Sequence, residues 1–160
     1  ASALTLLGLT DGDNASTGYG YTDIADFIIQ HGCNVEQNLE ELFRRVAFYI
    51  IVGNSDDYFR NHGFLLTRKG WELSPAYDIN PTLADNQSLL INRSTSESDL
   101  NILLASAGDY MLSPEKAKSI ITEVKTAMKS WRTEARRLGL LQRDIDMFAP
   151  RFDKWIESPM

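Results

Sequence analysis

Several features are scarce or missing in this chain of 160 residues, and each absence excludes a class of protein. The single cysteine, Cys33, cannot form an internal disulfide, so a reducing cytoplasm is the expected location. No run of roughly 18 apolar residues occurs, which excludes a membrane-spanning helix. The N-terminus has no basic segment before an apolar stretch, which argues against a signal peptide.

Positive charge is scarce as well. The chain carries 16 Lys and Arg residues against 22 Asp and Glu residues, a formal net charge of -6. Binding to nucleic acid needs a basic face that neutralises phosphates. We therefore expect no direct nucleic-acid binding by this chain, and any connection to DNA would come through a partner protein.

Apolar residues make up 43% of the sequence, enough to bury the core of a single domain, and most recur at helical spacing. Thr22 is expected to cap the first helix, and Asn34 to form a capping box with Gln37. Ser113 precedes Pro114, which suits the start of the longest helix. The expected helices cover residues 22–32, 34–53, 100–107, 114–138 and 144–155, the last bent or interrupted at Pro150.

Strands are expected only in residues 62–66 and 71–73, which flank a turn of the length and glycine placement of a hairpin. Trp71 lies beside Gly70 in this hairpin, and we expect it to pack the hairpin onto the helices. Residues 8–20 are expected to form a loop around Asp11 and Asp13. A calcium loop is excluded there, because the required glycine and the glutamate at the twelfth position are missing.

The most informative motif is formed by Asp56 and Asn61, five residues apart, followed by Asp78 beyond the hairpin. Phosphotransferases place a catalytic base and two magnesium ligands in this order. Magnesium keeps several waters and takes few protein ligands, so Asn61 and Asp78 would suffice as ligands. Asp56 would then be free to accept a proton from an attacking hydroxyl. Taken as spacing alone the motif is weak, since Asp and Asn are common in surface turns.

The neighbouring carboxylate, Asp57, has two interpretations. It could raise the pKa of Asp56 by like-charge repulsion, or it could face solvent, because neighbours in a loop often point apart. We expect Asp57 to face solvent.

Residues 48–65 and 70–81 together resemble the signature of the HipA family of serine/threonine kinases, the toxins of bacterial toxin–antitoxin pairs. The resemblance extends over residues 1–160 and implies a mainly α fold, the helical C-terminal lobe of a protein-kinase-like protein with one small β-hairpin. It also implies ATP and magnesium as cofactors, with Asp56 as catalytic base and Asn61 and Asp78 as metal ligands. The implied partners are a DNA-binding antitoxin and a protein substrate of the translation apparatus, commonly an aminoacyl-tRNA synthetase.

Two departures from the family pattern bear on activity. Tyr58 stands where the family usually has His, which supplies a cation near the transferred phosphoryl group. That role would pass to Arg60. Tyr58 and Arg60 are both candidate nucleotide contacts. The chain also has no glycine-rich phosphate loop and no strand lysine for the phosphates. We therefore expect activity in the intact protein rather than in this piece alone. The alternative function is a degenerate kinase-like lobe that serves as a protein-interaction module.

Overall fold

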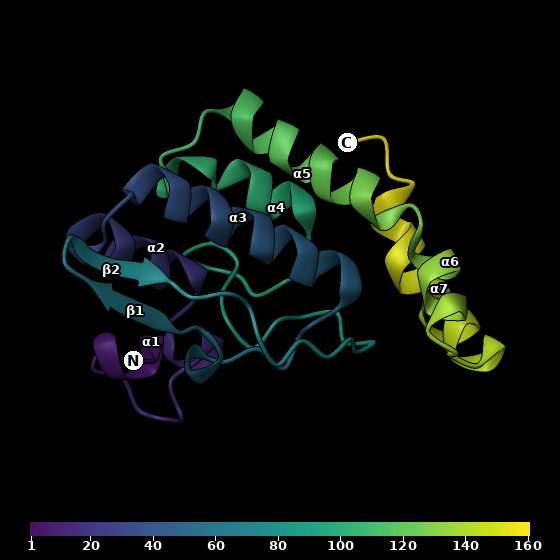
Figure 1. Ribbon diagram of the computed structural model, residues 1–160, viewed down its shortest axis with the longest axis horizontal. Coiled ribbons are helices and arrows are strands. Elements are labelled where there is room, and N and C mark those ends of the chain that lie inside the picture. Colours follow the sequence, from purple (N-terminus) through teal and green to yellow (C-terminus); the bar gives the residue numbers. More distant parts are fainter.

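The computed structural model describes residues 1–160, and most of them are helical (Figure 1). The α-helices are α1 (Ala3–Leu6), α2 (Tyr21–His31), α3 (Val35–Val52), α4 (Leu100–Ala105), α5 (Pro114–Met128), α6 (Trp131–Arg137) and α7 (Gln142–Ile156). Short 3-10 helices are η1 (Ala15–Thr17), η2 (Phe59–Asn61) and η3 (Ala107–Tyr110). Strands β1 (Phe64–Thr67) and β2 (Gly70–Leu73) form one antiparallel hairpin. A mainly α fold with one small hairpin is therefore confirmed.

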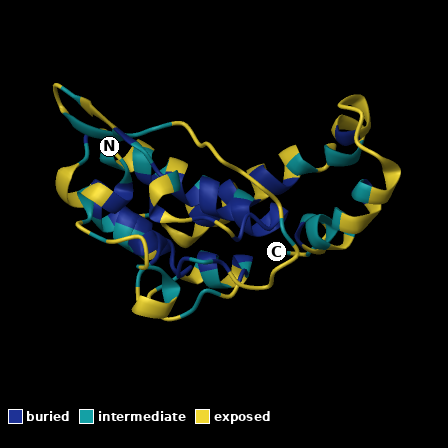
Figure 2. Ribbon diagram, turned by 90° about the horizontal axis from the view of Figure 1, so that it is seen from below, coloured by how far each residue is buried: buried dark blue, intermediate teal, exposed yellow.

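Helix α3 is the central element of the core. It contacts α2, α4, α5 and α7, and its fully buried residues include Leu42, Phe43, Val46 and Ile50. Spacings of three and four residues place such side chains on one stripe, which is why this segment forms a helix that other helices cover. Figure 2 shows the buried residues concentrated in the middle of the molecule. None of the helices is both long enough and apolar enough to cross a membrane.

The hairpin packs on the end of α2, as expected. The backbone amide of Cys33 donates a hydrogen bond to the Trp71 carbonyl at 3.0 Å, and Gly32 and Trp71 form an isolated bridge. The Trp71 side chain is half-buried and packs against the main core. In the strand register it lies opposite Leu66, which is 68% exposed.

Two predicted helix caps are wrong, and one is confirmed. Helix α2 begins earlier than expected, at Tyr21, so Thr22 lies inside it, and the Gly20 amide is satisfied by Asp23 at 2.8 Å. Asn34 does precede α3, but its backbone is left-handed (φ 47°) and its side chain donates to Glu72 at 2.6 Å instead of capping. Ser113 caps α5 by accepting from the Lys116 amide at 3.1 Å.

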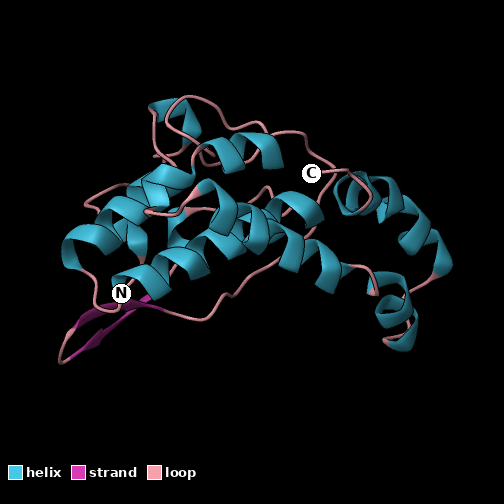
Figure 3. Cartoon of the chain, turned by 90° about the horizontal axis from the view of Figure 1, so that it is seen from above, coloured by secondary structure: helices cyan, strands magenta, loops and turns pink.

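The predicted long helix is divided into α5 and α6, which is a correction. Trp131 and Arg132, at the start of α6, both donate to Asp153 of α7, at 3.2 and 3.0 Å. These long-range contacts turn α6 back along α7, so the two helices lie side by side at one end of the molecule, opposite the hairpin (Figures 1 and 3). Helix α7 continues through Pro150 without interruption.

Trp71→Ala is expected to lower the free energy of unfolding by about 2 kcal/mol, because it removes a half-buried aromatic side chain from the hairpin–core contact. The exposed cross-strand neighbour provides the control: Leu66→Ala should change stability by less than about 0.5 kcal/mol. Urea denaturation of both variants measures the difference. Equal midpoints for the two would contradict the packing role of Trp71.

Candidate functional site

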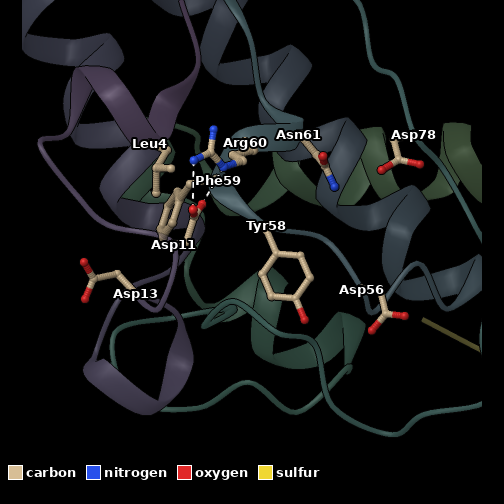
Figure 4. A pocket seen from close by; sticks show the side chains of 9 residues that line it. All are labelled: Leu4, Asp11, Asp13, Asp56, Tyr58, Phe59, Arg60, Asn61 and Asp78. Atoms are coloured by element: carbon tan, nitrogen blue, oxygen red, sulfur yellow. Dashed lines mark hydrogen bonds and ion pairs between the residues drawn. The ribbon is translucent and has the colours of Figure 1, made fainter.

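All five residues predicted for the site line one pocket of about 360 Å³. Its nine lining residues are Leu4, Asp11, Asp13, Asp56, Tyr58, Phe59, Arg60, Asn61 and Asp78. Figure 4 shows Asp56, Asn61 and Asp78 on one side of this pocket and the Arg60–Asp11 pair on the other, with Tyr58 below Arg60 and Asn61. The structure thus brings together side chains from both sides of the hairpin.

In residues 54–61, which we call the signature loop, burial alternates from Ser55 to Arg60. Ser55, Asp57 and Phe59 are buried, whereas Asp56 and the residues that follow each buried position are exposed. Tyr58 has an extended backbone, in which successive side chains point in opposite directions, and the chain then enters the 3-10 helix η2. Because every second residue is anchored inside the protein, the residues between them are presented to the pocket.

The expectation that Asp57 faces solvent is wrong, since its side chain is fully buried. Its Oδ2 accepts a hydrogen bond from the Tyr21 hydroxyl at 2.7 Å and lies 2.6 Å from Nε2 of His62. Burial, and then the nearby Asp57 charge, raise the pKa of Tyr21 well above its usual value, so the hydroxyl remains a donor. The only sequence signal for this pair was a histidine five residues after Asp57.

The first half of the signature loop is tied to the segment that follows Asp78. The backbone carbonyl of Asn54 accepts a hydrogen bond from Gln87 Nε2 at 2.9 Å. The side-chain oxygen of Asn54 accepts one from the Asn80 backbone amide, also at 2.9 Å. The Ser55 hydroxyl is hydrogen-bonded to that of Thr82. These contacts fix the distance between the two segments that carry the predicted catalytic and metal-binding residues.

Asp78 has a left-handed backbone conformation (φ 56°), which only a small fraction of non-glycine residues adopt. Asn80 holds its carboxylate by donating from Nδ2 to Oδ1 at 2.9 Å. Such conformations cost about 1 to 3 kcal/mol and persist where the surroundings enforce them. The Asp78 side chain is therefore oriented by its own turn.

Arg60 is held by a residue that sequence reasoning did not assign to the site. Asp11 accepts from Nε of Arg60 and, at 2.9 Å, from Nη2, as Figure 4 shows. The hydrogen bond to Arg60 lowers the pKa of Asp11, and both side chains are more than half exposed. The loop around Asp11 and Asp13 was predicted, but nothing local in the sequence indicated that it folds over the pocket.

The site offers few protein oxygen donors for a metal ion, so a metal there would need further ligands. No group of three or more His, Cys, Asp or Glu side chains is placed to hold a metal ion. Asn61 and Asp78 offer one amide and one carboxylate oxygen donor group at the same pocket. Magnesium accepts such a small protein contribution because waters and phosphate oxygens complete its octahedron.

Comparisons with known proteins give one family model, one relative and one solved structure. The sequence model of the HipA-like C-terminal domain matches residues 1–131. A putative kinase of Haemophilus influenzae is 37% identical over 60 residues, which cover 37% of this chain and 18% of that protein. A chain of the Shewanella oneidensis MR-1 complex of HipA, HipB and operator DNA matches with a TM-score of 0.74 and 15% identity, covering 97% of this chain and 41% of that one. The chain thus spans less than half the length of either protein.

Gly53→Ala is expected to destabilise the fold by about 3 kcal/mol. Gly53 ends α3 at φ 71°, and an added Cβ would lie 2.4 Å from the Thr82 carbonyl oxygen. Gly139→Ala is the matched control, because Gly139 also has a positive φ (84°) but open space around it. It should cost only about 1 to 2 kcal/mol. Thermal denaturation that ranked the two variants equally would show that the contact with Thr82 is unimportant.

Proposed function

Because the chain belongs to the HipA-like C-terminal domain family, we propose that it is the catalytic lobe of a serine/threonine protein kinase that uses ATP and magnesium. The observation that carries this proposal is the convergence of Asp56, Asn61 and Asp78 on one pocket. These residues come from two segments separated by the hairpin, and a chance collection of turn residues would not be expected to share a cavity.

The exposed Asp56 carboxylate is the catalytic base in this proposal. It orients a serine or threonine hydroxyl and accepts its proton as the oxygen attacks the γ-phosphate, while the bond between the γ-phosphorus and the bridging oxygen breaks and ADP leaves. Asn61 and Asp78 would hold magnesium, which when bound neutralises charge on the phosphates. Tyr58 and Arg60 flank the other side of this region and would donate hydrogen bonds to phosphate oxygens.

The proposed biological setting is a toxin–antitoxin pair. The likeness to a chain solved with HipB and operator DNA supports a DNA-binding antitoxin as partner. The net charge of -6 agrees with DNA contact through that partner rather than through this chain. The protein substrate is proposed to belong to the translation apparatus, with an aminoacyl-tRNA synthetase as the first to test.

A second candidate function is a degenerate lobe that acts as a protein-interaction module. The observation in its favour is the lack of an unpaired cation at the pocket: Tyr58 replaces the usual histidine, and Arg60 is engaged by Asp11. Transition-state charge would then have less stabilisation from protein groups.

Asp56→Asn and Asp78→Ala should differ in kind when measured in the full-length protein. Asp56→Asn should reduce kcat at least roughly 100-fold with little change in magnesium–ATP affinity, because the base acts in the transition state. Asp78→Ala should weaken magnesium–ATP binding as well as the rate. A phosphorylation assay combined with calorimetric titration separates the two effects.

The control for both variants is Asp85→Asn, which removes an exposed carboxylate outside the pocket and should leave both quantities unchanged. Phosphorylation by Asp56→Asn at the unmutated rate would refute the assignment of the base.

Tyr58→His distinguishes the kinase from the interaction module. Restoring an imidazole at this exposed pocket position should raise kcat roughly 10-fold if the site is catalytic, since a cationic donor stabilises the transferred phosphoryl group more than a phenol does. In a module that only binds a partner, phosphorylation would stay undetectable in both proteins. Rates of phosphate transfer to a synthetase substrate are the measurement.

A further inference from the structure

The signature loop rests on a cluster of four fully buried polar side chains, Tyr21, Tyr49, Asp57 and His62. Removing a carboxylate from water is costly even when hydrogen bonds compensate part of the loss. Asp57 does not line the pocket, so substrate contact does not account for its burial. An apolar residue of similar size could fill the same space at lower cost.

The connectivity of the cluster suggests what the charge does. Asp57 directly follows Asp56, and His62 directly follows Asn61. The contact of 2.6 Å between Asp57 and His62 therefore joins the two backbone positions next to the proposed base and the proposed metal ligand.

The cluster is attached to the rest of the protein at three points. The Tyr21 hydroxyl, from α2, donates to Asp57 at 2.7 Å, and the His62 carbonyl accepts from the Ala3 amide at 2.7 Å. The Tyr21 ring meets the His62 ring edge-on, with centroids 5.8 Å apart, and the Tyr49 ring lies 6.2 Å from it. The loop is therefore held from α1, α2 and α3, all of which belong to the core-forming part of the chain.

The cluster is not fully hydrogen-bonded within the protein. Oδ1 of Asp57, Nδ1 of His62 and the Tyr49 hydroxyl have no protein partner. Unpaired buried polar atoms lower stability, so this arrangement sacrifices stability while it fixes one loop conformation.

We propose that Asp57 is a positioning residue for phosphoryl transfer, acting through Tyr21 and His62 to hold Asp56 and Asn61 toward the pocket. This inference rests on the proposed kinase function and adds a role for a residue that never touches the substrate. Asp57 is fully buried, whereas the residues on both sides of it, Asp56 and Tyr58, are exposed at the pocket. Loss of the anchor would allow Asp56 to leave its catalytic orientation.

The first test is Tyr21→Phe in the full-length protein, which removes one donor to Asp57 and preserves the ring. We expect kcat to fall roughly 10- to 100-fold, because small displacements of a catalytic group have effects of this size. The KM for magnesium–ATP should change by less than about 2-fold, since His62 still holds the Asn61 side of the loop. Tyr110→Phe is the matched control: Tyr110 is equally buried and its hydroxyl has no partner, so kcat should not change.

A second readout needs no activity. Hydrogen–deuterium exchange of the backbone amides of residues 54–62 should accelerate in Tyr21→Phe and in Asp57→Asn, and exchange in α5 should not. If Asp57→Asn fails to fold, the exchange measured in Tyr21→Phe alone tests the positioning role. Unchanged exchange in the loop, or an unchanged kcat in Tyr21→Phe when Asp56→Asn is inactive, would overturn the positioning role. Accelerated exchange in a full-length protein that phosphorylates no substrate would instead refute the proposed function. It would still support the role of Asp57 in holding the loop.

Discussion

The buried carboxylate of Asp57 is the constraint on which the arrangement of the site depends. Asp57 is fully buried between the exposed residues Asp56 and Tyr58, so the inward direction of its side chain goes together with the outward direction of theirs. Phe59 and Ser55 repeat the same inward pattern on either side. The loop therefore needs no regular hydrogen-bonded strand to present alternate residues to the pocket. Its order comes from side chains that reach into the core.

Helix α3 provides the rigid base from which this loop departs, and α7 reaches the same region from the other end of the chain. Arg151 of α7 donates to the Ala84 carbonyl at 2.6 Å and to the Ser98 hydroxyl at 3.1 Å. A Cβ on Gly53 would lie 2.9 Å from its Nε, so the guanidinium also packs beneath the start of the loop. Helix α7 lies beyond residues 1–131, which the family model matches. A part of the chain outside the matched region thus supports the segment that follows Asp78.

The sequence was sufficient to predict the features that depend on local patterns. Helical periodicity predicted α3, the turn residues predicted the hairpin, and the family signature around Asp56, Asn61 and Asp78 predicted residues that share one pocket. The failures have long-range causes. Asp57 is buried because Tyr21, 36 positions away, supplies a donor. The predicted long helix is divided because Asp153 binds the start of α6. Neither partner is visible in a window of neighbouring residues.

The charges at the pocket constrain how a phosphate-bearing ligand can enter it. Asp11, Asp13, Asp56 and Asp78 line the pocket against a single cation, Arg60, so in the proposed function an anionic nucleotide would need a countercharge of its own. The pairing of Arg60 with Asp11 is a small obstacle, because exposed ion pairs contribute about 0 to 1 kcal/mol. A charge-assisted bond to phosphate is stronger than that, so Arg60 can exchange Asp11 for a bound phosphate. In the proposed function, Asp11 would hold the guanidinium near the pocket until a phosphate group took its place.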